Sequence, residues 1–285
     1  MRAFLIACVV VVLLLILLCV YYNESLKIEC YFIPKEEVPA AFCGSKIVML
    51  SDLHNHEFGK ENIRLLEKIR KEQPDYIMIA GDMLVKGKKF EAKRMKTFFS
   101  ELVGICPVYY APGNHEAYLE RLCPEHFYQK YIKEIEKIGV KYLANQSCYI
   151  EKDDQKIRIT GLHLPKKFFG KFYEKVKMEK EDLEKMLGKS EDCYEILMAH
   201  NPIYFPVYKK WGANLILSGH VHGGTVILPF IGGVISTNYE LFPKYDFGMF
   251  ESEHVRMILS RGLGTHTIKI RLFNVPEISV IILGK

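Results

Sequence analysis

The sequence predicts an α/β fold in which two β-sheets pack face to face with helices outside, preceded by one apolar helix. Three observations lead to this prediction. Strand-length apolar runs alternate with amphipathic segments in the first half, the second half is rich in short strands, and the first twenty residues are almost wholly apolar. The 285 residues suit a single large domain with ample length to bury a core.

The N-terminal helix is predicted from an uninterrupted apolar stretch between Ala3 and Val20, which would span roughly 27 Å as a helix, close to the thickness of a bilayer core. Tyr21 and Tyr22 follow, where aromatic rings favour the membrane interface. A cleaved secretory signal is the alternative, but it would have a shorter apolar region ending in a small-residue cleavage site. We therefore expect residues 1–22 to be a retained, single-pass transmembrane anchor.

The charges around this anchor weakly favour one orientation. Arg2 and the free amine precede the stretch, whereas Glu24, Lys27 and Glu29 follow it. Because basic residues tend to stay on the cytoplasmic side, we expect the N-terminus in the cytoplasm. The protein would then lie in the cell membrane with its folded domain outside the cytoplasm.

Residues 23–44 are predicted to tether the anchor to the folded domain, which would occupy residues 45–285. Prolines and mixed charge favour an irregular segment. The alternation of Leu26, Ile28 and Cys30 also fits a short strand at the edge of a sheet.

Strands and helices alternate through the first half of the domain. The strands are short apolar runs, and the helices place apolar residues three and four positions apart. The predicted strands cover 47–50, 76–80 and 107–111, and the predicted helices cover 60–72, 90–103 and 127–138. This β-α-β-α-β order favours a parallel sheet covered by helices.

After residue 139 the pattern changes to strands and turns with one charged helix near 173–187. The predicted strands cover 149–150, 157–159, 195–199, 215–217, 225–228, 256–259, 268–273 and 278–283. With the strands of the first half, we infer two sheets packed face to face, with helices outside, in one domain.

Composition excludes some classes of protein. The net charge of +5 comes without a clear cluster of basic residues, so no nucleic-acid partner is expected, and the short basic runs at 86–89 and 166–167 fit a solvated surface. The six cysteines beyond the anchor include no Cys-x-x-Cys pair, which disfavours a zinc knuckle or a redox motif. Free thiols and extracellular disulfides both fit this spacing, and the sequence does not predict an oligomeric state.

Five polar segments follow the ends of predicted strands. They are Asp52-Leu53-His54, Gly81-Asp82, Gly113-Asn114-His115-Glu116, His200-Asn201-Pro202 and Gly219-His220-Val221-His222. Ligands gather at the carboxyl ends of strands in open α/β sheets, so five such loops can line one pocket. Each segment alone is a weak signal, although His220 and His222 would share one face of an extended segment. Together they supply enough oxygen and nitrogen donors for two divalent metals, with one histidine left over.

In this order, the five segments resemble the signature of the calcineurin-like metallophosphoesterases over roughly residues 46–225. The resemblance implies a four-layer αββα fold and a metal-dependent phosphoric-ester hydrolase acting as a phosphoesterase, phosphodiesterase or lipid pyrophosphatase. The apolar anchor, Ser-Arg-Gly-Leu-Gly at 260–264 and Arg-Leu-Phe-Asn at 271–274 are similar to the membrane-associated bacterial branch. That branch includes cell-envelope phosphoesterases and enzymes that cleave the pyrophosphate of UDP-2,3-diacylglucosamine.

The resemblance also implies a role for each ligand-type residue. The first metal would take Asp52, His54 and His222. The second metal would take Asn114, His200 and His220. Asp82 would bridge the two, because its carboxylate has lone pairs for both ions. His115 would instead be the catalytic group that faces the substrate, stabilising the phosphoryl charge or protonating the leaving oxygen.

Mn²⁺ is the expected metal, with Fe²⁺ or Zn²⁺ as alternatives, since all three accept carboxylate and imidazole ligands. Two such cations can clamp a phosphoryl group and lower the pKa of a shared water, and the hydroxide then attacks in line and breaks the P–O bond. Arg261 is a candidate for binding a substrate phosphate, with a plain salt bridge as the equal alternative. Glu116 is expected to support His115 rather than to bind metal.

The anchor favours a membrane or cell-envelope substrate, either a phosphorylated lipid or a phosphorylated small molecule, and thus a place in lipid metabolism. The alternative function is a catalytically silent binding module with the same fold. Such members tend to lack metal ligands or the catalytic histidine, whereas this chain has all eight residues.

Overall fold

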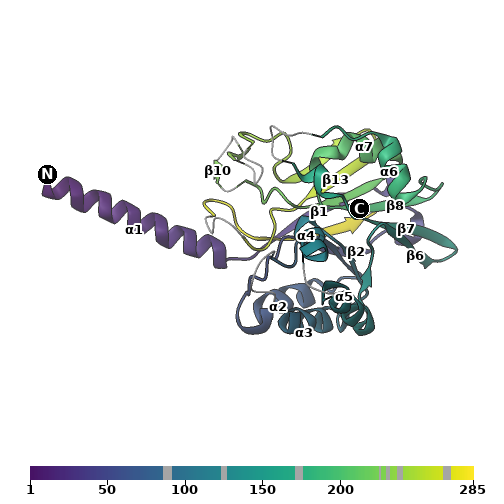
Figure 1. The fold of residues 1–285 in the computed structure, drawn as a ribbon, viewed down its shortest axis with the longest axis horizontal. Coiled ribbons are helices and arrows are strands. Elements are labelled where there is room, and N and C mark those ends of the chain that lie inside the picture. The colour runs from purple at the N-terminus through teal and green to yellow at the C-terminus, as the bar shows by residue number, and fades with distance from the viewer. Residues whose placement is uncertain are drawn as a thin grey trace.

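The computed structural model describes residues 1–85, 92–122, 127–170, 176–224, 226–228, 232–235, 240–265 and 271–285. In these residues, two six-stranded mixed sheets form one body, and a long N-terminal helix projects from it (Figure 1). The helices of the described part are α1 (Arg2–Glu24), α2 (Ile63–Glu72), α3 (Ala92–Val103), α4 (Asn114–Leu122), α5 (Phe127–Ile138), α6 (Lys180–Leu187) and α7 (Phe205–Trp211).

The first sheet has the strand order β1-β14-β2-β3-β4-β5. Its strands are β1 (Lys27–Ile33), β2 (Lys46–Leu50), β3 (Tyr76–Ala80), β4 (Val108–Ala111), β5 (Lys141–Tyr142) and β14 (Glu277–Leu283). The strands β2, β3, β4 and β5 are parallel, and β14 runs antiparallel to β2. The parallel arrangement predicted for the first half is therefore confirmed.

The second sheet has the strand order β12-β13-β9-β8-β7-β6. Its strands are β6 (Gln146–Lys152), β7 (Gln155–Leu162), β8 (Tyr194–Ala199), β9 (Leu215–Ser218), β12 (Gly248–Ser252) and β13 (Val255–Leu259). A separate two-stranded ribbon is made by β10 (Ile227–Leu228) and β11 (Gly232–Gly233).

Three apolar clusters separate the layers. Alternate side chains of a strand point to opposite faces of its sheet, so Val48 and Leu50 of β2 pack with α2, α3 and α5, while Ile47 and Met49 pack against the second sheet. A third cluster joins the second sheet to α6 and α7 around Trp211. The predicted four-layer arrangement, with helices outside both sheets, is confirmed.

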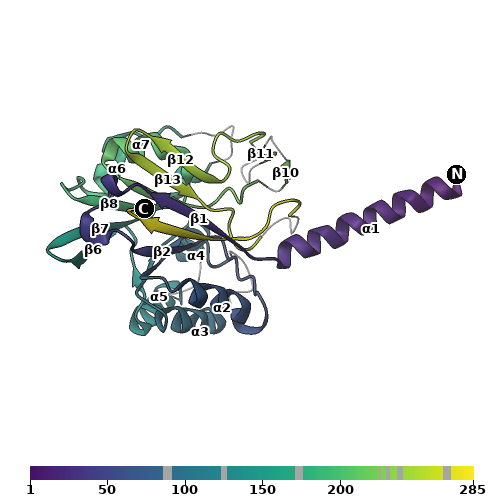
Figure 2. The ribbon, with the colours of Figure 1, turned by 180° about the vertical axis from the view of Figure 1, so that it is seen from behind.

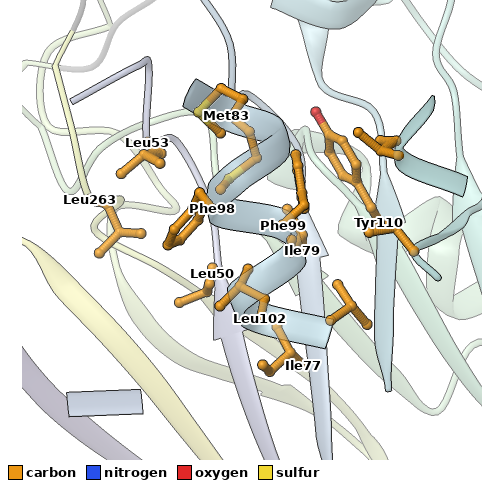
Figure 3. Close-up of a cluster of buried hydrophobic side chains, with 14 of the residues drawn as sticks. Leu50, Leu53, Ile77, Ile79, Met83, Phe98, Phe99, Leu102, Tyr110 and Leu263 are labelled. Atoms are coloured by element: carbon orange, nitrogen blue, oxygen red, sulfur yellow. The ribbon is translucent and has the colours of Figure 1, made fainter. Parts of the chain in front are cut away.

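The core beneath the first sheet also fixes the loops that follow its strands. Figure 3 shows Phe98 and Phe99 of α3 beside Ile79 of β3, in the same cluster as Leu53 and Met83. Leu53 and Met83 come directly after Asp52 and Asp82 and are fully buried. Apolar burial of the next residue therefore holds each aspartate in place.

The segment expected to tether the anchor contributes a strand, as the alternation at Leu26, Ile28 and Cys30 suggested. Residues Lys27–Ile33 form β1, which pairs in parallel with β14 at the edge of the first sheet. Figure 2 shows both strands leading from the end of α1 into the body. The fold therefore begins before residue 45, and only two residues separate α1 from the sheet.

Three local predictions were incomplete or wrong. The polar segment at Asn114 was expected to be a loop, but it opens α4. The helix predicted near 173–187 is described only as α6, from Lys180, and residues 171–175 lie outside the described part. Residues 268–270 also lie outside it, and Leu272 forms a single bridge with Val226 instead of a strand.

All seven described cysteines are free thiols, and they are exposed or partly exposed.

Candidate metal centre

The ligand-type residues predicted from the sequence lie just beyond neighbouring strands of the two sheets. Asp52 follows β2, Asp82 follows β3, and Asn114 follows β4 in the first sheet. His200 follows β8 and His220 follows β9 in the second. These strands are parallel neighbours within each sheet, so their carboxyl ends bring the five loops together.

One group of side chains consists of Asp52, His54 and His222, whose ligand-type atoms all lie within 4.8 Å of one another. The Nε2 atoms of His54 and His222 are 3.1 Å apart. The Oδ1 atom of Asp52 lies 3.7 Å from His54 Nε2 and 3.3 Å from His222 Nε2. This spacing leaves room for one small cation between a carboxylate and two imidazoles.

A second group consists of Asp82, His200 and His220, again within 4.8 Å of one another. Asp82 Oδ2 is 3.1 Å from His200 Nε2 and 3.9 Å from His54 Nε2. The Asp82 carboxylate therefore lies between the two groups. His220 and His222 belong to different groups, so the expectation that they share one face is wrong, because both backbones turn into the left-handed region.

His115 lies close to the Asp82 carboxylate and bonds to it through its backbone N–H. Its N–H donates a hydrogen bond of 2.8 Å to Asp82 Oδ1, and its Nε2 atom lies 4.0 Å from Asp82 Oδ2. The ring meets the His54 ring edge-on, with centroids 4.6 Å apart. The ligand-type atoms of His115, His54 and Asp82 also lie within 4.8 Å of one another, so the His115 side chain, at the start of α4, adjoins both groups.

The donor set fits divalent cations. The buried side-chain oxygen of Asn114 accepts no hydrogen bond within the described part of the protein. His200 Nδ1 lies 2.6 Å from the carbonyl of Ala80, and His222 Nδ1 lies 3.1 Å from that of Gly264. A proton held on Nδ1 by a carbonyl leaves the Nε2 lone pair for a metal, as is usual for metal-ligating histidines.

Backbone strain is concentrated in the same loops. Left-handed conformations are uncommon for residues with a side chain and cost of order 1–3 kcal/mol each. Of the eight predicted residues, five adopt them, namely Asp52, His54, Asp82, His220 and His222. Such strain persists only where the surrounding structure imposes it, and it is typical of functional sites.

Two glycines allow the loops to approach the aspartates. A Cβ atom on Gly113 would lie 2.2 Å from Asp82 Oδ1, and one on Gly219 would lie 2.3 Å from Asp52 Oδ2. No side chain can be accommodated at these distances, so glycine at both positions permits the close packing of the five loops.

The ionisable side chains of the centre shift one another's pKa values. Burial opposes ionisation of Asp52 and Asp82, but neighbouring histidines, His200 among them, hold the pKa of both carboxyls below the usual range. Burial likewise opposes protonation of His200, but the two aspartates raise its pKa to about 10. Two ionised carboxylates buried together favour the binding of cations at this place.

Glu116 supports the loops after β3 and β4, whereas it was expected from the sequence to support His115. Its buried carboxylate accepts hydrogen bonds from the backbone N–H groups of Asp82, Leu84 and Gly113, at 2.8, 3.1 and 2.9 Å, and from the hydroxyl of Tyr110 at 2.8 Å. One side chain thus connects the loop after β3 with the loop after β4, and none of its oxygens faces a metal group.

Two further residues, Arg271 and Asn274, brace the loops from the side opposite Glu116, and neither was assigned a role from the sequence. Nη2 of the fully buried Arg271 donates to the carbonyls of Gly262 and Gly264, at 3.2 and 2.8 Å. Asn274 Nδ2 donates to the carbonyls of His222 and Gly224, at 2.7 and 2.6 Å. In the sequence, the feature that pointed to these two residues was the Arg-Leu-Phe-Asn motif at 271–274, which contains both.

Arg261 forms a salt bridge, which was the alternative to binding a substrate phosphate. Its Nε atom lies 3.3 Å from Oε2 of the buried Glu277, and its guanidinium stacks 3.9 Å above the ring of Phe247. The geometry therefore favours a structural contact over a phosphate contact.

The remaining histidines lie outside the two groups. His56 packs on Phe58, and His254 is exposed. His163 is half-buried beside a cavity of about 240 Å³ next to the centre, whose lining includes Asn114, Tyr118, Arg121, His163, Lys166 and Phe169. His126, His266 and the basic run at 86–89 lie outside the described residues.

Comparison with known proteins gives a consistent result. A family model described as calcineurin-like phosphoesterase matches residues 45–224, which contain every predicted metal-ligand position. The chain is 26% identical to the uncharacterized metallophosphoesterase YkuE of Bacillus subtilis, over 91% of this chain and 86% of that protein. It is 25% identical to a transmembrane protein with a metallophosphoesterase domain from Danio rerio, over 88% of this chain and 56% of the relative. It is 21% identical to the UDP-2,3-diacylglucosamine pyrophosphatase LpxG of Chlamydia muridarum, over 83% of each protein.

Proposed function

The chain belongs to the calcineurin-like phosphoesterase family and is a metal-dependent phosphoric-ester hydrolase, and we propose that its substrate is a phosphoester or pyrophosphate of the membrane or cell envelope. One observation mainly supports hydrolysis: two buried groups of carboxylate and imidazole side chains lie next to each other, with Asp82 between them. A buried cluster of this composition suits two divalent cations, and ionisable groups gathered in this way are typical of functional sites.

We propose the following division of roles within the centre. Asp52, His54 and His222 would hold one metal. Asn114, His200 and His220 would hold the other. Asp82 would be shared, as its position between the two groups supports. Mn²⁺ is the proposed metal, with Fe²⁺ or Zn²⁺ as alternatives.

The bound metals would polarise the phosphoryl oxygens and supply a nucleophile at neutral pH. The protein's own contribution is to fix the geometry and to move a proton. His115 is the proposed catalytic group, because its ring lies beside the shared carboxylate without belonging to either proposed ligand set. It would stabilise the developing negative charge or protonate the leaving oxygen.

The neighbouring cavity supports a substrate with a sizeable leaving group. It begins at Asn114, within the proposed ligand set, and Arg121 and Lys166 contribute positive charge to its lining. The ring of Phe169 lies 5.4 Å from that of His220 and connects the cavity to the centre. A second phosphate, as in the pyrophosphate named for the chlamydial relative, would match this charge.

Metal removal tests the proposed hydrolysis. We expect no turnover of p-nitrophenyl phosphate or bis(p-nitrophenyl) phosphate by the full-length protein in detergent after dialysis against a chelator. Readdition of Mn²⁺ should restore the activity more fully than Fe²⁺ or Zn²⁺. Screening nucleotide-linked and lipid pyrophosphates under the same conditions would rank the substrates. Full turnover in excess chelator would contradict the proposal, and tight metal binding without turnover of any substrate would favour the silent binding module.

We also propose that residues 1–22 anchor the protein and that the domain lies outside the cytoplasm. The helix α1 is long and apolar enough to cross a membrane, and none of its residues is buried in the protein. The flanking charges support the orientation. Protease added to intact cells should then digest the domain. Protection of the domain until the cells are lysed would place it in the cytoplasm instead.

A further inference from the structure

Four large apolar side chains are exposed near the end of α1. They form a set that we call the apolar rim, which consists of Leu228, Leu241, Phe242 and Phe273 and is between 37% and 64% exposed. The ribbon β10–β11, which contains Leu228, lies on the side of the domain from which α1 leaves, in both views of the molecule (Figures 1 and 2). Exposed apolar groups gathered at one place indicate a surface that is covered in use.

Backbone hydrogen bonds join the segments that carry the rim. The N–H of Ile227 donates to the carbonyl of Leu272 at 3.1 Å, and the N–H of Val234 donates to that of Val226 at 2.9 Å. The N–H of Phe242 then donates to the carbonyl of Val234 at 2.9 Å. The rim residues are thus carried by segments that are hydrogen-bonded to one another.

The end of α1 is fixed against the same surface. The Tyr22 ring packs edge-on against Phe273, with centroids 5.7 Å apart. Arg64 Nη2 donates to the carbonyl of Glu24 at 2.8 Å, and β1 begins at Lys27. An apolar helix of 23 residues therefore ends in contact with the rim, and only two residues separate it from β1.

The rim also adjoins the metal centre. In the sequence, Phe273 lies between Arg271 and Asn274. Their side chains donate hydrogen bonds to the carbonyls of Gly264 and His222. The rim residue that contacts α1 therefore belongs to the segment that braces the metal loops. The centre also lies toward α1, because β1 begins just after α1 and is parallel to β14, β14 is antiparallel to β2, and Asp52 follows the end of β2.

We propose that the apolar rim inserts into the interface of the bilayer that α1 crosses, so that the metal centre opens at the level of the lipid headgroups. The occupant of the rim is the lipid surface itself, because the rim is continuous with an apolar helix of membrane-spanning length. Apolar side chains placed in this way enter the boundary between headgroups and acyl chains by about 5–10 Å. The substrate would then be a phosphorylated lipid headgroup presented from the membrane plane, a conclusion that rests on the proposed function.

The single tryptophan of the chain allows a direct test. Trp211 is buried under the second sheet, so Trp211→Phe gives a silent background. In this background, Phe242→Trp and Phe273→Trp report on the rim, and Tyr149→Trp is the control. Tyr149 is 39% exposed on β6, at the end of the domain away from α1 (Figure 1). The full-length variants would be reconstituted into phosphatidylcholine–phosphatidylglycerol vesicles with brominated acyl chains.

We expect the rim tryptophans to lose roughly half of their emission in brominated vesicles relative to unbrominated ones, because bromine quenches at short range within the depth that interfacial side chains reach. The emission of the control should hardly change. Equal, negligible quenching at all three positions would overturn the proposal. Protection of the rim tryptophans from both bromolipid and an aqueous quencher would assign the rim to a second copy of the chain and would also overturn it.

The two proposals can fail separately. Turnover of bis(p-nitrophenyl) phosphate by the same preparations reports on hydrolysis without a lipid surface. Quenching at the rim without turnover would contradict only the proposed function. Turnover without quenching would contradict only the membrane contact.

Discussion

Asp82→Asn is expected to lower the rate of phosphoester hydrolysis by about 10³-fold or more and to remove at least one metal per chain. The carboxylate lies between both groups, 3.1 Å from His200 Nε2 and 3.9 Å from His54 Nε2. An asparagine side chain keeps one oxygen for the N–H of His115, 2.8 Å away. It has no negative charge and no second oxygen, so it cannot bridge two cations.

Metal content measured by elemental analysis should fall with the activity. The matched control is Asp153→Asn, which makes the same exchange in an exposed turn whose left-handed backbone suits asparagine. This control should keep its metals and its turnover. A variant Asp82→Asn that retains two metals and full activity would show that the groups are not bridged at this residue.

The sequence predicted the proximity of Asp52, Asp82 and the histidines, because these residues come from local motifs at strand ends. Asp52 and Asp82 each follow a short strand whose last four residues are buried, and each is followed by a buried apolar residue, Leu53 or Met83. That pattern is visible without any knowledge of long-range contacts. Once five such loops are placed at the carboxyl ends of packed sheets, their proximity follows from topology.

The same local signals could not predict the bracing of the loops. Arg271 and Asn274 act through hydrogen bonds to backbone carbonyls up to 52 residues away, and backbone carbonyls carry no sequence signature. The apolar run near 268–273 favoured a strand by propensity, but only Leu272 forms a bridge in the described part. Tertiary contacts decided the conformation at this place.

The start of α4 was missed for a related reason. Asn114, His115 and Glu116 are polar and were interpreted as a loop, because asparagine and histidine are poor helix formers. The backbone N–H of His115 and the carboxylate of Glu116 bond to the loop after β3, and the buried Leu119 supplies an apolar contact for the helix. The helix is stabilised by the centre that it helps to build.

Glu116→Gln is expected to lower the free energy of unfolding by about 2–4 kcal/mol, although the change in size is negligible. In the native protein, Oε1 accepts from Leu84 and Tyr110, and Oε2 accepts from Asp82 and Gly113. An amide has one oxygen, so its NH₂ group would face two donors that no longer have an acceptor. Each buried donor left without a partner costs about 1–3 kcal/mol.

Unfolding should be followed by chemical denaturation in detergent with a chelator present, so that differences in metal binding do not contribute. The control is Glu120→Gln, one turn further along α4, where the glutamate is 43% exposed beside His163. Its free energy of unfolding should change by no more than about 0.5 kcal/mol. Because Glu116 joins the loop of Asp82 to the loop of Asn114, the metal affinity of Glu116→Gln should fall as well. Equal stability of the two variants would mean that the loops keep their positions without this carboxylate, and that the strained backbone at Asp82 is imposed by the sheets alone.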